Sequence, residues 1–154
     1  MIKVKPLVIS LLISLGTGTL SGLLTMNSMD HYKEINKPVL SPPGFLFPIV
    51  WGILFTLMGI SAYMIYVSDC KNRKRALTLY GIQLGVNFVW PLIFFIAQEY
   101  LIAFIWLVAL WILVFFMIIM FYRCKPLAGY LQIPYLIWLT FAGYLNIMIF
   151  LLNR

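Results

Sequence analysis

Indole and amide side chains recur at helical spacing in the apolar parts of this sequence. Trp138, Ala142 and Asn146 follow one another at every fourth position. Asn87 lies three positions before Trp90 in an earlier apolar stretch. Because residues three or four apart share a helix face, each group forms one stripe. Indole rings provide broad stacking surfaces and amides provide hydrogen bonds, a combination that suits a large, flat, hydrophobic ligand.

Each of these residue types also has a simpler structural explanation. Asn87 and Asn146 can hydrogen-bond between helices, which is worth about 0.6–2 kcal/mol each, and this role is compatible with facing a ligand. Tryptophans commonly form a belt at the membrane surface. Counting about 1.5 Å per residue from the expected helix ends places Trp51 roughly 12 Å deep and Trp138 roughly 20 Å deep. That depth favours a pocket over a belt for these two.

Residues for conventional catalysis are missing from the apolar stretches. The single histidine, His31, lies in a polar segment, and none of the four acidic residues lies within an apolar stretch. No nucleophile–base pair and no metal-ligand cluster can be assembled, so no metal is expected and no cofactor is required. A channel or pump normally needs ionisable residues within its bundle, so ion transport is disfavoured.

The composition indicates a membrane protein that must position these residues on helices. Of 154 residues, 64% are hydrophobic and 10% are charged. Five stretches without charge, each long enough to cross a bilayer, predict an all-α integral membrane protein of one domain, 1–154. The predicted helices span about 6–26, 43–67, 76–97, 100–122 and 128–152.

Basic residues are distributed unequally between the two predicted ends of the bundle. The end with the N-terminus carries Lys3, Lys5, Lys71, Arg73, Lys74, Arg75, Arg123 and Lys125. The opposite end carries Lys33, Lys37 and Arg154. The positive-inside rule predicts a cytoplasmic N-terminus and an external C-terminus, and a bacterial plasma membrane is the expected location. The net charge of +7 follows from this asymmetry, and no nucleic-acid partner is expected.

Two cysteines and two pairs of glycines carry further expectations. Cys70 and Cys124 fall at the predicted cytoplasmic end, where a reducing compartment predicts free thiols. Small residues four apart allow helices to approach closely, so they are candidates for helix packing or dimerisation. These candidates are Gly18, Gly22, Gly81 and Gly85.

A long polar segment, 27–42, separates the first two predicted helices and is expected to act as a lid or binding segment. It ends in a proline-rich entrance to the second helix. There Ser41 is expected to be the N-cap, with Pro42 and Pro43 in the first turn. Pro48 lies deeper and is expected to kink the helix.

Three segments resemble the signature segments of the TspO/MBR family, also called tryptophan-rich sensory proteins, translocator proteins or peripheral-type benzodiazepine receptors. They read KPVLSPPGFLFPIVWGILFTLMG, QLGVNFVWPLIFF and WLTFAGYLNIMIFLLN. The resemblance implies a five-helix bundle, often a homodimer, with a pocket opening toward the first loop. It also implies binding of porphyrins such as protoporphyrin IX and of benzodiazepine or isoquinoline carboxamide ligands.

The resemblance also implies which residues form the pocket. The expected ligand-binding residues are Tyr32, Pro42, Trp51, Phe55, Asn87, Trp90, Trp138, Ala142, Leu145 and Asn146. Animal members of the family are credited with cholesterol binding through an L/V-x-Y-x-K/R pattern. No tyrosine here satisfies that pattern, because Arg154 is too far from Tyr144, so cholesterol is not expected.

Four functions remain open from the sequence. The first is a receptor or sensor for porphyrins, and the second is light-dependent breakdown of bound porphyrin, in which Trp51 and Trp138 would be the catalytic residues. Protoporphyrin IX would then be ligand or substrate. The third is transport of tetrapyrroles or other amphiphiles, and the fourth is a role as a membrane assembly partner.

Overall fold

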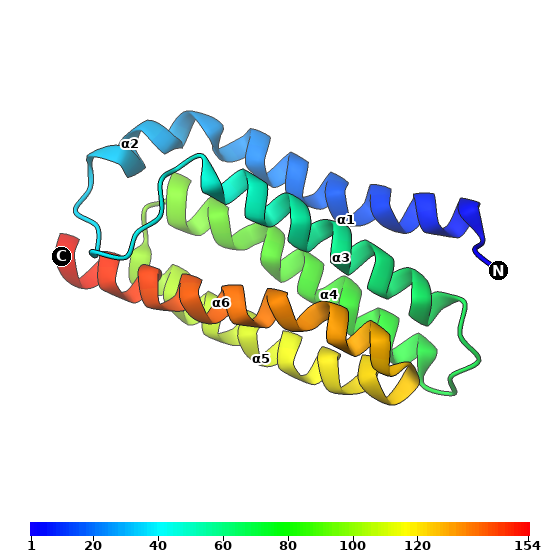
Figure 1. Cartoon of the computed structure of the whole chain (residues 1–154). Coiled ribbons are helices and arrows are strands. Elements are labelled where there is room, and N and C mark those ends of the chain that lie inside the picture. Colours follow the sequence, from blue (N-terminus) through cyan, green and yellow to red (C-terminus); the bar gives the residue numbers. More distant parts are fainter.

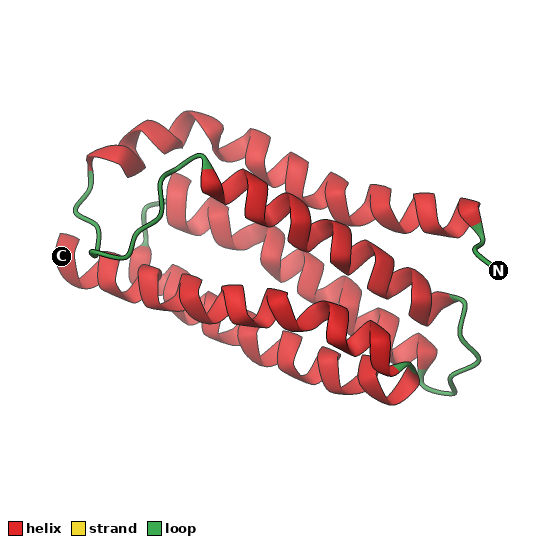
Figure 2. Ribbon diagram, in the orientation of Figure 1, coloured by secondary structure: helices red, strands yellow, loops and turns green.

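The computed structural model describes all 154 residues, and every regular element is helical (Figure 1, Figure 2). The long helices are α1 (Val4–Thr25), α3 (Leu46–Tyr66), α4 (Arg73–Pro91), α5 (Tyr100–Cys124) and α6 (Pro126–Asn153). A 3-10 turn, η1 (Met26–Ser28), joins α1 to the short helix α2 (Met29–Glu34), and a π-helical turn, η2 (Leu92–Ile96), extends α4. Five helical segments are long and apolar enough to cross a membrane, which confirms the predicted fold class.

The five long helices form an antiparallel bundle. In Figure 1, α1 lies along one side and α5 and α6 lie together on the other, with α3 and α4 between them. The N-terminus lies at one end of the bundle, while α2 and the C-terminus lie at the opposite end. Large apolar side chains on the outer faces of α1 and α5, such as Leu12 and Ile105, are exposed and suit contact with lipid.

Small residues allow α1 and α3 to pack closely. A methyl group added at Gly59 would lie 2.6 Å from Ser14 Oγ, and one added at Gly18 would lie 2.5 Å from the Phe55 ring. The Ser10 hydroxyl also donates a hydrogen bond of 2.6 Å to the Gly59 carbonyl. Gly18 therefore packs inside the chain. Gly22 has open space around it.

The proline-rich entrance to α3 differs from expectation in two respects. The helix begins at Leu46, after a turn in which the Leu46 N–H donates to the Pro43 carbonyl at 3.0 Å. Ser41 is not the N-cap, and its buried hydroxyl has no partner. Pro48 is the third residue of α3, within the first turn, where a missing N–H breaks no helical hydrogen bond. The expected kink therefore has no cause at this position.

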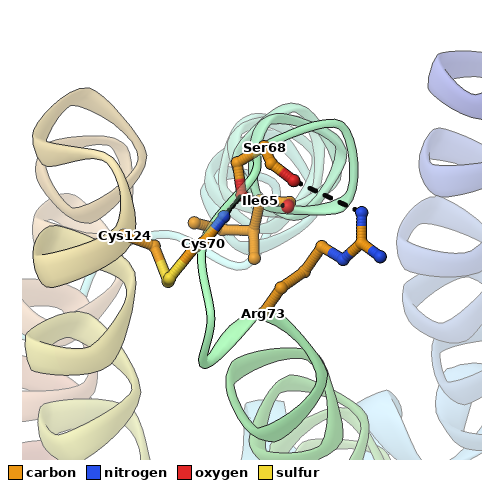
Figure 3. The surroundings of a disulfide bond; sticks show 5 residues. All are labelled: Ile65, Ser68, Cys70, Arg73 and Cys124. Atoms are coloured by element: carbon orange, nitrogen blue, oxygen red, sulfur yellow. Dashed lines mark hydrogen bonds between the residues drawn. A yellow bond between two sulfur atoms is a disulfide. The ribbon is translucent and has the colours of Figure 1, made fainter.

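The prediction of free thiols is wrong, because a disulfide joins Cys70 to Cys124 (Figure 3). It ties the loop between α3 and α4 to the last residue of α5, with a Cα–Cα distance of 5.2 Å. The Arg73 guanidinium holds the same loop by donating to the Ser68 carbonyl at 3.3 Å. The cysteines are 54 positions apart, so their proximity depends on how the helices pack.

Candidate ligand-binding site

A cavity of about 410 Å³ lies between α1, α3, α4 and α6 at the end of the bundle that α2 covers. The residues that the sequence predicts for the site and that line this cavity are Tyr32, Trp51, Phe55, Asn87, Trp90, Trp138, Ala142, Leu145 and Asn146. Pro42 is the one predicted residue that does not line it. Its place is in the turn before α3, outside the lining. Volumes of this order are typical of small-molecule sites, which span about 300–1,000 Å³.

Aromatic rings form the wall contributed by α3 and α6. The Trp51 ring centroid lies 6.5 Å from that of Trp138, with the two planes nearly perpendicular, and 5.6 Å from that of Phe55. Phe47 packs edge-on against Trp138 at 6.0 Å. The two indoles therefore present large apolar surfaces from neighbouring helices to the same space.

Two amides beside the cavity are engaged in interhelical hydrogen bonds. Asn146 accepts from the Trp90 indole N–H at 3.0 Å and donates to the Tyr100 carbonyl at 2.8 Å. Asn87 donates to the Tyr135 hydroxyl at 2.6 Å, and this hydroxyl donates to Gln83 Oε1 at 2.7 Å. The structural explanation of both asparagines is thus confirmed. It leaves Asn87 Oδ1 without a bond to protein at the cavity.

One further polar atom of the lining is free. The indole N–H of Trp138 is buried and donates to no protein acceptor. A buried N–H without a partner costs free energy. Because this nitrogen has almost no accessible surface, a ligand could reach it only if neighbouring side chains moved. The lining is mainly apolar but also contains the hydroxyl residues Thr19, Ser21 and Thr25, which suits a largely hydrophobic molecule with a few polar atoms.

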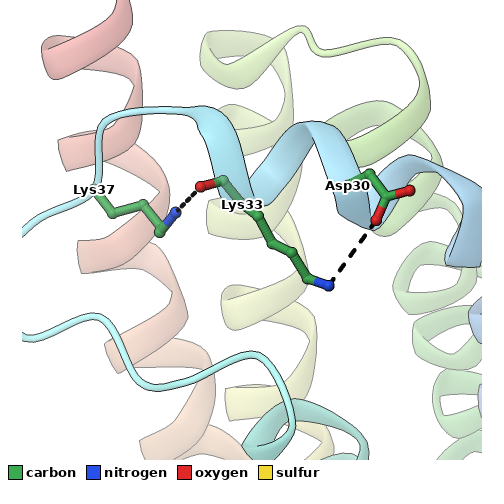
Figure 4. A network of polar contacts seen from close by, with 3 residues as sticks. All are labelled: Asp30, Lys33 and Lys37. Atoms are coloured by element: carbon green, nitrogen blue, oxygen red, sulfur yellow. Dashed lines mark hydrogen bonds and ion pairs between the residues drawn. The ribbon is translucent and has the colours of Figure 1, made fainter.

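The lid that covers the cavity is more ordered than a plain loop. Tyr32 of α2 is 5% exposed and packs against Phe47, Phe94 and Phe95, with ring centroids 5.5–6.2 Å apart. The Lys37 ammonium donates to the Lys33 carbonyl (Figure 4). It also donates to the Tyr32 carbonyl and lies 4.9 Å from the centre of the Tyr32 ring. It thereby satisfies carbonyls that the end of α2 leaves unpaired.

Sequence reasoning missed two parts of the wall. The first is the face of α1, where Gly18, Gly22 and Thr25 line the cavity at intervals of three or four residues. The spacing of Gly18 and Gly22 was visible in the sequence, but it indicated helix packing or dimerisation. The second is the pair Phe94 and Phe95, which the π-helical turn after Pro91 brings over the cavity.

The lining limits the chemistry available at this site. No acidic, basic or histidine side chain lines the cavity, and no group of acidic, histidine or cysteine side chains in the chain could hold a metal ion. Tyr32 is the one lining residue with an ionisable side chain. The arrangement can stack a flat ligand, bind a few of its polar atoms and exclude water.

The fold and the cavity define a class of five-helix membrane proteins with an aromatic ligand cavity under a lid. The model of the TspO/MBR family matches residues 9–152, and the chain belongs to this family. Family membership supports a role as a membrane receptor or sensor.

Several relatives match over most of their length. The chain is 35% identical over 152 residues to the tryptophan-rich protein TspO of Archaeoglobus fulgidus, covering 98% of this chain and 99% of the relative. It is 37% identical over 125 residues to the tryptophan-rich protein TspO of Chlorobaculum tepidum, covering 80% and 79%. It is 35% identical over 121 residues to the translocator protein of Sus scrofa, covering 77% and 72%.

Proposed function

We propose that this protein is a membrane receptor or sensor that binds porphyrins, with protoporphyrin IX as ligand, in the cavity between Trp51 and Trp138. The observation that carries the proposal is the pair of indoles at 6.5 Å on neighbouring helices, facing a cavity of about 410 Å³. Flat aromatic ligands stack favourably on such surfaces. Benzodiazepine and isoquinoline carboxamide compounds have similar aromatic surfaces and are expected to compete for the same space.

A titration with protoporphyrin IX in detergent tests this function through quenching of tryptophan fluorescence in darkness. Trp51→Phe and Trp138→Phe are expected to weaken saturable binding by about tenfold, since aromatic contacts contribute about 0.5–1.5 kcal/mol beyond their buried area. Trp111→Phe is the matched control, because Trp111 lies outside the cavity lining and its indole donates to Thr140. Equal affinity in all four proteins would refute the assignment of the cavity.

Light-dependent degradation of the bound porphyrin is a second candidate function. The observation in its favour is a run of redox-active side chains, because the Trp51 ring lies 6.5 Å from Trp138 and 6.2 Å from Tyr135. The excited porphyrin and dioxygen would supply the reactivity, while the indoles would exchange electrons with the macrocycle. Loss of the porphyrin absorption bands under illumination, slowed in Trp51→Phe and Trp138→Phe, is expected. Unchanged absorption bands in the illuminated wild type would refute degradation and leave only the receptor function.

Transport of tetrapyrroles is less consistent with this architecture. Beyond the cavity, the half of the bundle nearer the N-terminus is filled by buried side chains, among them Met58, Val114 and Met117. Such packing provides no continuous passage. Protein-dependent uptake of porphyrin into sealed proteoliposomes would argue for transport instead.

We further propose that the protein is a homodimer through the outer face of α4. Gly81 and Gly85 are exposed, and no atom lies within 4 Å of a methyl group added at either position. Glycines four apart allow a partner helix to approach closely. Gly85→Leu is expected to yield monomers in cross-linking experiments, whereas Gly16→Leu, on the exposed face of α1, should remain dimeric. A dimeric Gly85→Leu protein would exclude this interface.

For orientation, we propose that the N-terminus is cytoplasmic and the C-terminus external in a bacterial plasma membrane. The eight basic residues at the N-terminal end of the bundle support this orientation. The cavity and its lid would then face outward. Fusion of a reporter enzyme to either terminus provides the test, and an active periplasmic reporter at the N-terminus would reverse the assignment.

A further inference from the structure

The side chain of Asn153 connects the end of α6 to the lid segment. Its Oδ1 accepts from the Asn36 backbone N–H at 3.0 Å, and its Nδ2 donates to the Asn36 carbonyl at 2.7 Å. The same Nδ2 donates to the Ile149 carbonyl at 2.8 Å, which fixes the amide on its own helix. The two bonds between Asn153 and Asn36 join residues 117 positions apart in the chain.

This contact lies directly outside the cavity. Asn36 is four residues beyond Tyr32, and Asn153 is four residues beyond Ile149. Tyr32 and Ile149 both line the cavity, and both are buried. The bonds to Asn153 therefore fasten the lid to α6 one helical turn outside the residues that close the cavity.

The contact uses the side chain of Asn153 but only the backbone of Asn36. Both bonds reach the backbone of Asn36, so the Asn36 side chain takes no part in them. They lie at an exposed position, where water competes for each partner. Such exposed hydrogen bonds can hold the lid segment closed and still break and reform.

We propose that Asn153 is a latch residue, which holds the lid closed and sets how fast ligand enters and leaves the cavity. The inference rests on the proposed function, since it concerns access to that cavity. If ligand passes only while the lid is open, the latch reduces the open fraction in both the free and the bound protein. Weakening it then raises the association and dissociation rates by a similar factor, and the equilibrium affinity changes little.

Rates of protoporphyrin IX binding, measured by stopped-flow quenching of tryptophan fluorescence, test the latch. Asn153→Ala is expected to raise both rates by about threefold to tenfold, the effect of losing one or two exposed hydrogen bonds, with the Kd within about twofold. Asn153→Asp keeps the acceptor and loses the donor, so its rates are expected to lie between those of the wild type and those of Asn153→Ala. Asn36→Ala is the matched control and should behave as the wild type.

Two kinetic results would overturn the proposal. The first is unchanged rates in Asn153→Ala. The second is a faster dissociation with an unchanged association rate, because that pattern reports damage to the bound state and not release of a lid.

A ligand-free measurement separates this inference from the proposed function. Hydrogen–deuterium exchange of the backbone in 33–42 is expected to be faster in Asn153→Ala than in Asn36→Ala. Absence of saturable porphyrin binding in the wild type would refute the proposed ligand while this exchange experiment still tests the latch. Equal exchange in the two variants would refute the latch even if porphyrin binds.

Discussion

At the scale of single residues, the polar atoms of the cavity divide into those used for packing and those left free. Asn146 uses both its amide atoms on other helices, whereas Trp138 keeps an unpaired indole N–H. The first kind sustains the shape of the site, whereas the second is an unpaired buried group that costs stability. Substitutions of the two residues should therefore have different consequences.

Asn146→Leu is predicted to destabilise the fold. Asn146 is 1% exposed, and its loss leaves the Trp90 N–H and the Tyr100 carbonyl without their partners. Such losses typically cost about 1–3 kcal/mol. Thermal unfolding in detergent should show a lower Tm for Asn146→Leu, while Asn27→Leu, at an exposed position in η1, should unfold as the wild type does. Equal stability of the two variants would contradict the structural role of Asn146.

At the scale of elements, the C-terminal end of α4 is shaped by an unusual turn. Pro91 is followed by η2, where the Ala97 N–H donates to the Leu92 carbonyl at 3.0 Å, and this turn places Phe94 and Phe95 against Tyr32. The chain then reverses through Gln98, which has a φ of 57°. Side chains other than glycine are strained in this left-handed region.

Gln98→Gly is therefore predicted to stabilise the protein. Glycine adopts this conformation without the penalty of about 1–2 kcal/mol that a side chain brings. Its greater freedom in the unfolded chain offsets part of the gain, so an increase of up to about 1 kcal/mol in the free energy of unfolding is expected. Gln98→Ala keeps the strain and should give no increase. Denaturation curves that rank alanine above glycine would show that the turn is not strained.

The sequence predicted the membrane-spanning helices correctly because these depend on local composition. The five spans were predictable because each needs only about 20 residues without charge. The start of α3 at Leu46 was missed because the prolines form a turn before the helix, in which the Leu46 N–H donates to the Pro43 carbonyl. The contact of Asn153 was missed because it joins residues 117 positions apart. The lining from α4 and α6 was predictable from spacing, and Phe55 and Tyr32 were predictable from the family resemblance alone. The wall from α1 needed the packing of Gly18 on Phe55.

At the scale of the whole molecule, the two ends of the bundle differ in character. One end carries the lid, the cavity and the latch, and the other carries the basic loops and the disulfide (Figure 1, Figure 3). The proposed orientation places the basic end in the reducing cytoplasm. Disulfides are rare in that compartment, so a Cys70–Cys124 disulfide in growing cells would argue for the reverse orientation.

The Cys70–Cys124 disulfide is predicted to stabilise the fold, because it links residues 54 positions apart. Reduction of the purified protein should lower the free energy of unfolding by about 2–4 kcal/mol. Denaturation curves of the oxidised and reduced proteins check this, with Cys70→Ser as the control that reduction should leave unchanged. Equal stability of the oxidised and reduced wild type would contradict a stabilising role for the disulfide.

The most direct test of ligand binding in this cavity is to fill it. Ala142 is buried between Trp138 and Asn146 on the cavity wall, and Ala109 is exposed on the outer face of α5. The measurement is the Kd of protoporphyrin IX for Ala142→Phe and Ala109→Phe, each with its Tm to confirm folding. We predict at least tenfold weaker binding in a folded Ala142→Phe protein and unchanged binding in Ala109→Phe. Wild-type affinity in the folded Ala142→Phe protein would contradict the assignment of this cavity as the porphyrin site.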